Sequence, residues 1–327
     1  MCWKLLAWKV YFNFNRVLTS KFFSLSGTEY PVAMQLPPSL KALFPADRSL
    51  SLTPTERFTQ WSSLVYVLFG TSMLLIPSFW ANFWQAELVG RTSGYIQLGG
   101  LSLAIEGFLL IVASRSRHRV PGHGHINITV FTRIVLINLA AWKLFQAGTA
   151  PVRYLFFFVA LDNSLAVGTF LVWIFTEKDA TLVLFFKEIA GLVFRFPSGS
   201  WSSFAVLVTG IVQFAGGVYL KNVEHLRSAL NLDPSAGYSD TFLSFHFSLS
   251  IAHAVLYIFN GQAVSRSFNA SCVFYRVAIN MPLVFLLAVT GKVELILSVF
   301  LMCADFTFAM FILVFLYCDD INNKEKK

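Results

Sequence analysis

Val130-Phe131-Thr132-Arg133-Ile134-Val135 is matched later in the chain by Val273-Phe274-Tyr275-Arg276-Val277-Ala278. In both copies an Asp follows the Arg after 29 positions, Asp162 after Arg133 and Asp305 after Arg276. The residues between them are mostly apolar and numerous enough for parts of two helices. We therefore interpret each copy as an antiparallel helical hairpin, covering about 130–175 and about 273–315.

A glycine stands near the middle of each Arg–Asp interval, Gly148 in the first copy and Gly291 in the second. Glycine readily adopts the left-handed backbone conformation that ends many helices, so these glycines mark the turn between the two helices of each hairpin. An Arg and an Asp at equal distances from a turn lie at the same depth. The sequence thus predicts that the Arg and the Asp of each hairpin face each other.

The composition is that of a membrane protein. Of the 327 residues, 56% are hydrophobic and 13% are charged, whereas soluble domains carry about 25% charged residues. The mean hydropathy is +0.64. Apolar runs of about 20 residues, each long enough to cross a bilayer as a helix, recur along the chain. We expect an all-α, polytopic membrane protein whose surroundings are the lipid bilayer.

The net charge of +8 does not indicate nucleic-acid binding. The basic residues are scattered in loops between apolar runs, and most of the 25 fall in segments that alternating spans would place on one side of the membrane. This distribution predicts that both chain ends lie inside and that nucleic acid is not a partner.

About eight transmembrane helices are expected, built as two tandem four-helix units at 61–176 and 201–317. Four spans per unit is an even number, so the units should have parallel orientation. Two further sequence similarities favour the duplication. Trp61-Ser62-Ser63 with Gly70 matches Trp201-Ser202-Ser203 with Gly210, and Ser102-Leu103-Ala104-Ile105 matches Ser248-Leu249-Ser250-Ile251. The predicted spans cover 61–79, 94–113, 128–147, 152–176, 201–220, 241–259, 272–290 and 294–317.

The remaining segments are a basic cytoplasmic arm at 1–60, a connector at 177–200 and a tail at 318–327. The arm has the composition of a mitochondrial targeting helix or of a segment lying on anionic lipid, and a start at Met34 would remove its first half. Residues 181–195 are too few to cross and predict an interfacial helix; a crossing there would invert the units. An endomembrane or plasma membrane is favoured over a mitochondrial one.

Local signals refine the helix ends. Trp61 at one end of the first span, and Trp80 and Trp84 at the other, are expected to form interfacial belts. Asn127 and Asn269 each begin a glycosylation sequon at the start of a hairpin. Because both fall on the predicted inner side, we interpret them as helix N-caps instead.

Charged residues inside a bilayer are costly and are candidates for function. The pairs Arg133–Asp162 and Arg276–Asp305 are interpreted as structural ion pairs that hold each hairpin, because an Arg–carboxylate pair satisfies both partners. The alternative is a role in moving ions or protons.

A second candidate, an intramembrane polar site, consists of Glu106, Lys143, His246 and His253. Glu106 and Lys143 have no counterpart in the other half of the chain, so they either pair with each other or line a polar site in the first unit. His246 and His253 are seven positions apart and share one helix face. A core or pocket histidine is favoured over a ligand, since no other span contains a His to complete a haem site.

Motifs of known catalytic families are absent from the sequence. We find no P-loop, no dinucleotide-binding glycine pattern, no nucleophile elbow and no zinc-protease motif. The four cysteines form no C-x-x-C pair, so neither a disulfide framework nor a metal site is indicated. We predict no cofactor and no catalytic residue.

Residues 58–147 resemble the tumour-suppressor-inducible four-span membrane proteins. The resemblance rests on residues of the first three spans: Trp61, Leu68-Phe69-Gly70, Pro77, Gly99-Gly100, Arg133, Ala140, Trp142 and Gln146. It implies one four-helix unit and no defined enzymatic activity. The chain departs from the family pattern at Leu139, where the family has an acid, and in its second unit.

These observations predict a multi-pass membrane protein that is not an enzyme: a structural or accessory component, or a binder of apolar ligands such as a lipid, with other membrane proteins as potential partners. One alternative is a transporter or channel with a charged path along Glu106, Lys143, Asp162 and Asp305. Another is an intramembrane lipid-modifying enzyme that uses Glu106 or His253, which requires the two to share a cavity.

Overall fold

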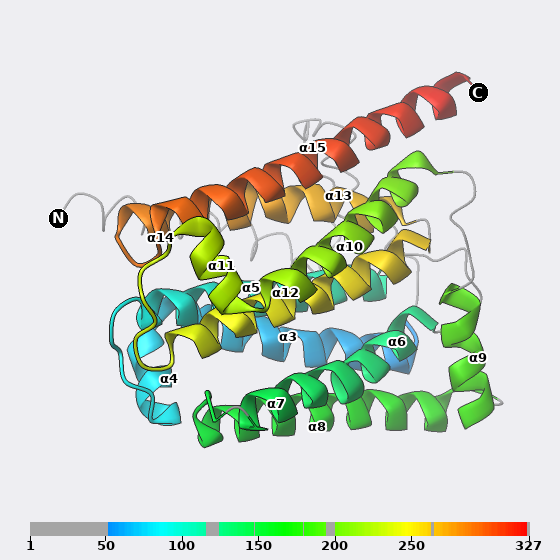
Figure 1. Ribbon diagram of the computed structural model, residues 1–327. Coiled ribbons are helices and arrows are strands. Elements are labelled where there is room, and N and C mark those ends of the chain that lie inside the picture. Colours follow the sequence, from blue (N-terminus) through cyan, green and yellow to red (C-terminus); the bar gives the residue numbers. More distant parts are fainter. Residues whose placement is uncertain are drawn as a thin grey trace, which may run out of the picture. The chain divides into compact units, whose positions relative to one another are not determined.

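The computed structural model describes residues 52–115, 124–146, 148–178, 180–193, 200–262 and 265–325, and all of them belong to one compact unit. Within these residues the chain forms helices and no strands (Figure 1). Most of the predicted arm and of the basic loop after residue 115 lie outside the described residues. The helices are α3 (Pro54–Leu75), α4 (Pro77–Trp84), α5 (Thr92–Arg115), α6 (Gly124–Thr132), η1 (Arg133–Ile137), α7 (Asn138–Gln146), α8 (Val152–Thr176), α9 (Leu182–Val193), α10 (Trp201–Leu220), α11 (Val223–Leu230), α12 (Ser239–Gln262), α13 (Arg266–Phe274), η2 (Tyr275–Asn280), α14 (Met281–Val289) and α15 (Leu295–Glu325).

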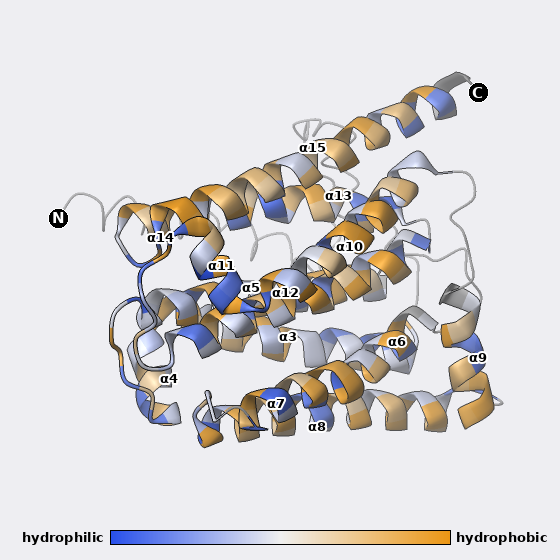
Figure 2. Cartoon of the chain, in the orientation of Figure 1, coloured by the Kyte–Doolittle hydropathy of each residue, from blue (hydrophilic) through white to orange (hydrophobic). Residues whose placement is uncertain are grey.

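Seven helical segments in the described part are long and apolar enough to cross a membrane. Three of the membrane-length segments are irregular. In α6–η1–α7 and α13–η2–α14 the helix continues through a π-helical middle part, whereas α3 and α4 form a bent pair. The bent pair passes the same test only when both parts are taken together, which raises the number to eight. Apolar residues dominate along these helices (Figure 2). The chain therefore has the architecture of a multi-pass membrane protein.

The first span is bent between α3 and α4, and each of these helices begins with a proline. Thr53 caps α3 in a reciprocal capping box: its hydroxyl accepts from the Glu56 N–H at 3.2 Å, and its own N–H donates to the Glu56 carboxylate at 2.8 Å. Pro77 disfavours the helical conformation at Ile76, where φ is −130°. The chain turns there by 101°, so the predicted span at 61–79 ends early.

This bend buries two tryptophans that the sequence placed at the membrane interface. Trp80 and Trp84 are 6% and 0% exposed, whereas Trp61 is 71% exposed. Trp84 packs on Tyr154 of α8, with ring centroids 4.9 Å apart, and on Phe242 of α12 at 5.8 Å. The predicted belt of Trp80 and Trp84 is therefore wrong, because α4 leaves the direction of α3 and packs against α5 and α8.

Helices α3 and α10 run in the same direction, and so do α5 and α12 (Figure 1). Helix α9 follows α8 in the chain, runs across the ends of its neighbours and packs against α6. Its 12 residues extend only about 18 Å at 1.5 Å per residue. A bilayer core is about 30 Å thick, so α9 is too short to cross it.

The most buried helices are α5 and α12, which pack against each other. Within their most apolar windows, 67% and 78% of the residues are buried, against 22–39% for the other five segments. Each also packs closely on the helix that begins its half of the chain, α5 on α3 and α12 on α10. Glycines permit this approach: a side chain at Gly70 would lie 2.4 Å from backbone atoms of Gly100 and Ala104.

Asn127 and Asn269 are not helix caps. Both are 0% exposed and lie inside α6 and α13, whose helices begin earlier than predicted. The amide of Asn127 donates to Glu188 at 2.6 Å, and that of Asn269 lies 3.0 Å from the hydroxyls of Ser202 and Ser203. Both residues therefore join helices, and neither side chain is exposed in the folded protein.

The glycine contacts yield a stability prediction. Replacing Gly70 by Ala should destabilise the protein by about 1–3 kcal/mol, because the new methyl group meets rigid backbone. Replacing Gly216 by Ala should be neutral or stabilising by up to about 1 kcal/mol, since nothing lies within 4 Å of the added atom. Thermal unfolding of the two variants in one detergent tests the difference, and a Gly70→Ala variant as stable as Gly216→Ala would contradict it.

Candidate functional site

Glu106 and His253 meet where α5 packs on α12. The Glu106 Oε2 atom lies 3.1 Å from Nε2 of His253, and the two side chains are 13% and 6% exposed. Their helices belong to different predicted four-helix units, yet α5 and α12 pack against each other and bring the two side chains together.

Ser102 connects both histidines of α12 to α5. Its backbone carbonyl lies 3.0 Å from Nε2 of His253, and its hydroxyl lies 2.8 Å from Nδ1 of His246. Because a carbonyl only accepts, Nε2 of His253 carries a hydrogen directed at Ser102. The two histidines share one helix face, as their spacing predicts, and that face is turned toward α5.

A small cavity lies beside Glu106. Its charged and phenolic lining comes from four helical segments: Tyr66 of α3, Glu106 of α5, Arg133 of η1 and Asp162 of α8. Its volume is about 20 Å³, which is enough for roughly one water molecule. The rest of the lining is two threonines and apolar side chains: Thr129, Thr132, Leu103, Ile137, Phe158, Leu249, Ala252 and Leu256.

Arg133 and Asp162 line this cavity together, but no ion pair joins them among the described contacts. The Asp162 carboxylate accepts a hydrogen bond from the Tyr66 hydroxyl instead. The Arg133 guanidinium lies over the Tyr66 ring, 4.9 Å from its centroid. Arg133 is 5% exposed, and both its Nη atoms are buried without a hydrogen-bond partner. Tyr66 thus stands where a direct Arg–Asp bond was predicted.

Arg276 and Asp305 have a different geometry, because they form a buried ion pair. The guanidinium also donates to Gln213 at 2.6 Å and to the Tyr257 hydroxyl at 3.3 Å. Asn280 donates to the second carboxylate oxygen of Asp305. Both charges are therefore compensated on several sides, as expected of an ion pair with a structural role.

π-Helical segments position both arginines. The segment η1 begins at Arg133, and η2 contains Arg276 as its second residue. A π-helical turn holds one extra residue, which rotates the following part of the helix relative to the preceding part. Sequence patterns did not predict these segments, although such turns are frequent at functional sites.

Lys143 is separate from the other three members of the predicted polar site. It lies exposed in the last turn of α7, whereas Glu106 is directed at His253. The predicted alternative of a Glu106–Lys143 pair is therefore not formed. The site that the structure assembles consists of Glu106 and His253 with Tyr66, Arg133 and Asp162.

The chemistry of this cluster follows from its charges. The two carboxylates of Glu106 and Asp162 face one guanidinium, that of Arg133. An uncompensated charge is expensive in apolar surroundings, so one additional positive charge would stabilise the cluster. A proton meets this need within the space of the cavity. No group of three or more His, Cys, Asp or Glu side chains in the described part is arranged to hold a metal ion.

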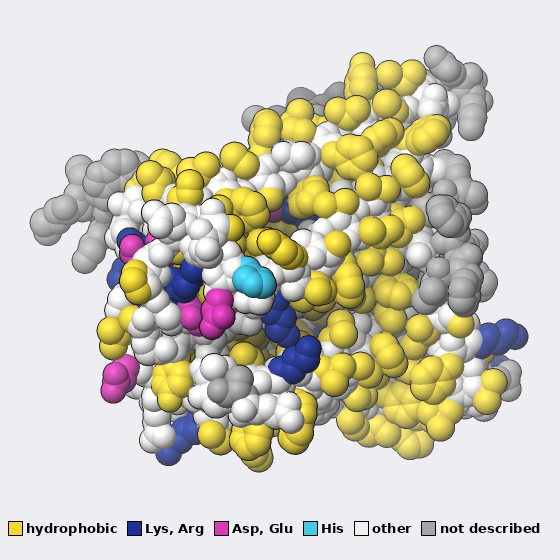
Figure 3. Space-filling view, in the orientation of Figure 1, with side chains coloured by type: hydrophobic (Ala, Val, Ile, Leu, Met, Phe, Trp, Pro, Cys, Tyr) yellow, Lys and Arg dark blue, Asp and Glu magenta, His cyan; other side chains and the backbone are white. Residues whose placement is uncertain are grey.

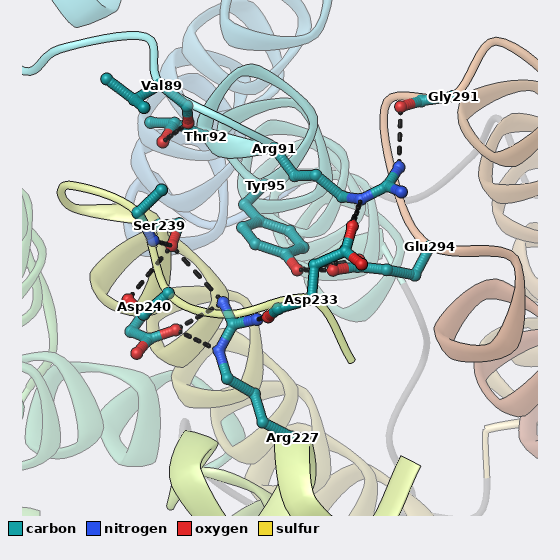
Figure 4. A network of polar contacts seen from close by, with 12 residues as sticks. Val89, Arg91, Thr92, Tyr95, Arg227, Asp233, Ser239, Asp240, Gly291 and Glu294 are labelled. Carbon is teal, nitrogen blue, oxygen red and sulfur yellow. Dashed lines mark hydrogen bonds and ion pairs between the residues drawn. The ribbon is translucent and has the colours of Figure 1, made fainter. Parts of the chain in front are cut away.

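A second polar network, which the sequence did not reveal, joins loops at one end of the helices (Figure 4). Arg91 donates to Asp233 at 2.8 Å and to the carbonyl of Gly291 at 2.9 Å. The Tyr95 hydroxyl lies 2.7 and 2.8 Å from the carboxylate oxygens of Glu294. These partners are 142 to 200 positions apart, so no local spacing indicates them.

Comparisons of the chain with models of protein families, with curated proteins and with solved structures find no match.

The two Arg–Asp geometries predict unequal effects of removing the acid. Asp305→Ala leaves Arg276 buried without its counter-ion, which typically costs about 3–5 kcal/mol. Asp162→Ala removes one charged hydrogen bond to Tyr66, worth about 1.5–3 kcal/mol. Thermal unfolding and yield should therefore fall further for Asp305→Ala. An equal or larger loss in Asp162→Ala would show that Arg133 depends on Asp162 as strongly as Arg276 depends on Asp305.

Proposed function

We propose that this multi-pass membrane protein binds a proton in the cluster of Glu106, Asp162 and Arg133 and acts as a proton-dependent transporter. The observation that carries the proposal is the 3.1 Å approach of the Glu106 carboxylate to His253, beside a cavity that Asp162 and Arg133 also line. Chains of Asp, Glu and His inside a membrane are typical of proton relays in pumps and transporters.

Charge balance supports the proton. With both acids ionised and His253 neutral, the cluster holds two negative charges and one positive charge. Each unbalanced charge in an apolar medium costs several kcal/mol, and the cost disappears when one carboxylate is protonated. The site is therefore expected to gain and lose a proton as its access to water changes.

The position of the site supports a transport role. Glu106 belongs to α5 and His253 to α12, so a movement of one helix against the other changes their separation. Broken or bent spans are common around transporter sites, and here they are the bend at Ile76 and the π-helical segments η1 and η2. We further propose eight spans in two tandem, parallel four-helix units, with the bent pair α3–α4 as the first span.

Several contacts support the tandem arrangement. The turn glycines Gly148 and Gly291 both have positive φ, +62° and +68°. Helix α6 packs on α12, and α13 packs on α5, so the third span of each proposed unit contacts the second span of the other. If a two-fold axis related the two units, the α6–α12 and α13–α5 contacts would be equivalent. The resemblance of residues 58–147 to the four-span family stays a prediction.

An intramembrane enzyme is a weaker proposal. Glu106 and His253 do converge, as such an enzyme requires. However, the cavity of about 20 Å³ has no room for an acyl chain. The hydroxyl of Ser102, on the same helix as Glu106, interacts with His246. We therefore assign no catalytic reaction.

An accessory role remains the second candidate, and α15 favours it. Only 22% of the residues in its most apolar window are buried. Phe306, Met310 and Leu313 are among its exposed side chains and would suit contact with another membrane protein as well as with lipid. Native mass spectrometry from the source membrane distinguishes the two, because an accessory subunit should retain a stoichiometric protein partner.

Protonation of the cluster is tested directly by infrared spectroscopy. The wild type should show the C=O band of a protonated carboxylic acid that shifts in D₂O and diminishes when the pH is raised. Glu106→Gln should lose or alter this band, because an amide has no carboxyl group to protonate. Glu87→Gln, which changes an exposed acid in a loop, is the matched control and should leave the band intact.

Transport is tested in liposomes with an internal pH-sensitive dye. A pH gradient should dissipate faster with wild type and with Glu87→Gln than with Glu106→Gln, by at least about tenfold if protonation is required for turnover. If all three behave as empty liposomes while the infrared band is present, the protein binds a proton without carrying it, and the accessory role would replace transport.

A further inference from the structure

The guanidinium of Arg133 needs a partner that the neighbouring side chains do not supply. In the second hairpin, both Nη atoms of Arg276 donate to oxygen atoms of the protein. Both Nη atoms of Arg133 are buried, and they have no hydrogen-bond partner within the described part of the chain. A buried charged donor without an acceptor is strongly unfavourable, so an acceptor is expected beside Arg133.

Tyr66 explains the difference between the two arginines. Gly70 of α3 contacts the backbone of α5 as Gly210 of α10 contacts the backbone of α12. Tyr66 and Val206 each stand four residues before these glycines, so they occupy equivalent places in the two halves. A valine cannot donate a hydrogen bond, and the acid of the second hairpin bonds its arginine directly. Tyr66 instead bonds the acid of the first hairpin and leaves the arginine without that partner.

Glu106 supplies a matching acceptor that is also unsatisfied. Its Oε2 atom lies 3.1 Å from Nε2 of His253, but the hydrogen on that nitrogen is directed at the carbonyl of Ser102. Among the residues that the structure describes, Oε2 therefore has no hydrogen-bond donor. Two donor atoms of Arg133 and one acceptor atom of Glu106 thus lack partners, and both residues line the same cavity.

This cavity has the size and the lining of a site for one water molecule. Its volume is about 20 Å³, and a single water needs at least about 10–15 Å³ and two to four polar partners. The hydroxyls of Thr129 and Thr132, in the lining, donate to backbone carbonyls at 2.7 and 2.8 Å, so only their lone pairs remain. Water accepts from a guanidinium and donates to a carboxylate, which an anion or a metal cation cannot do together.

The missing partner has to come from inside the protein. Side chains on the face drawn in Figure 3 are mostly apolar, and most of its charged side chains gather toward the end where α4 and α11 lie. Lipid is expected against such a surface, so bulk water does not reach Glu106 and Arg133 across it. Within a bilayer, polar groups are satisfied by other protein groups or by water held in a cavity.

We propose that one water molecule occupies this cavity, where it accepts a hydrogen bond from Arg133 and donates one to Glu106. The site binds water whether or not the protein transports protons. A second part rests on the proposed function: the water passes the proton between Glu106 and Asp162, which line the same cavity. Protonated Glu106 gives its proton to the water oxygen while the water gives one of its own hydrogens to ionised Asp162. The water is regenerated, and the two acids exchange their charge.

The water is tested by a crystal structure of the full chain grown in a lipid mesophase, at a resolution that shows ordered water on the loops. A density peak is expected about 2.7–3.2 Å from an Nη atom of Arg133 and from Oε2 of Glu106. Ala252→Val adds two carbon atoms to the cavity lining and should remove the peak. Ala160→Val, which changes an exposed position of α8, is the matched control and should keep it.

The relay is tested with the same three proteins in liposomes that contain the pH-sensitive dye. Ala252→Val should dissipate a pH gradient more slowly than the wild type by about tenfold or more, because it lacks a proton-transfer partner. Ala160→Val should match the wild type. Thermal unfolding verifies that each variant is folded, and if Ala252→Val does not fold, the wild-type density decides the water site by itself.

Four results would contradict the proposal or part of it. Ordered water elsewhere in the wild-type map without a peak in the cavity would overturn the site. An anomalous signal at the peak in crystals soaked with Tl⁺ would identify a monovalent cation and overturn it as well. Wild-type flux in a folded Ala252→Val protein that lacks the peak would overturn the relay alone. Wild-type protein that behaves as empty liposomes would overturn transport and the relay with it, while the density still decides the water site.

Discussion

The contact between α5 and α12 lies at the centre of the structure and holds its two halves together. These two helices are the most buried, and each is held against the first helix of its own half by glycine-mediated backbone contact. Where α5 and α12 pack on each other, Glu106 and His253 approach to 3.1 Å, and their side chains are only 13% and 6% exposed.

The same chemistry is used differently in the two hairpins. Arg276 forms an ion pair with Asp305, and both of its Nη atoms have hydrogen-bond partners. Arg133 stacks on Tyr66, while Asp162 bonds to that tyrosine, so the guanidinium remains without a hydrogen-bond partner next to a cavity. The second cluster thus provides a geometric reference for the first, because in it the Arg and the Asp of the hairpin bond directly.

Much of the fold was predictable because apolar runs and turn glycines are local signals. The membrane-length helices, the turns at Gly148 and Gly291 and the short helix α9 follow from such signals. The bend at Ile76 was not recognised, although Pro77 indicated it.

The alignment of the two halves also differs from the predicted one. Gly107 contacts Ser63 of α3 in the same way as Gly261 contacts Ser203 of α10. This correspondence is shifted by about two helical turns from the one that matches Ser102 with Ser248. Apolar helices tolerate several registers, and only the close contacts select one.

Composition and spacing along the chain are enough to predict the membrane-length helices, the turns of the hairpins and the ionisable residues within apolar runs, because all of these are local properties. They also single out Glu106, His246 and His253. Only the tertiary structure decided which of these groups meet. Glu106 faces His253 and not Lys143, and Tyr66 comes between Arg133 and Asp162. These pairings depend on how helices far apart in sequence pack against each other, and a contact between distant helices leaves no periodic signal in one chain.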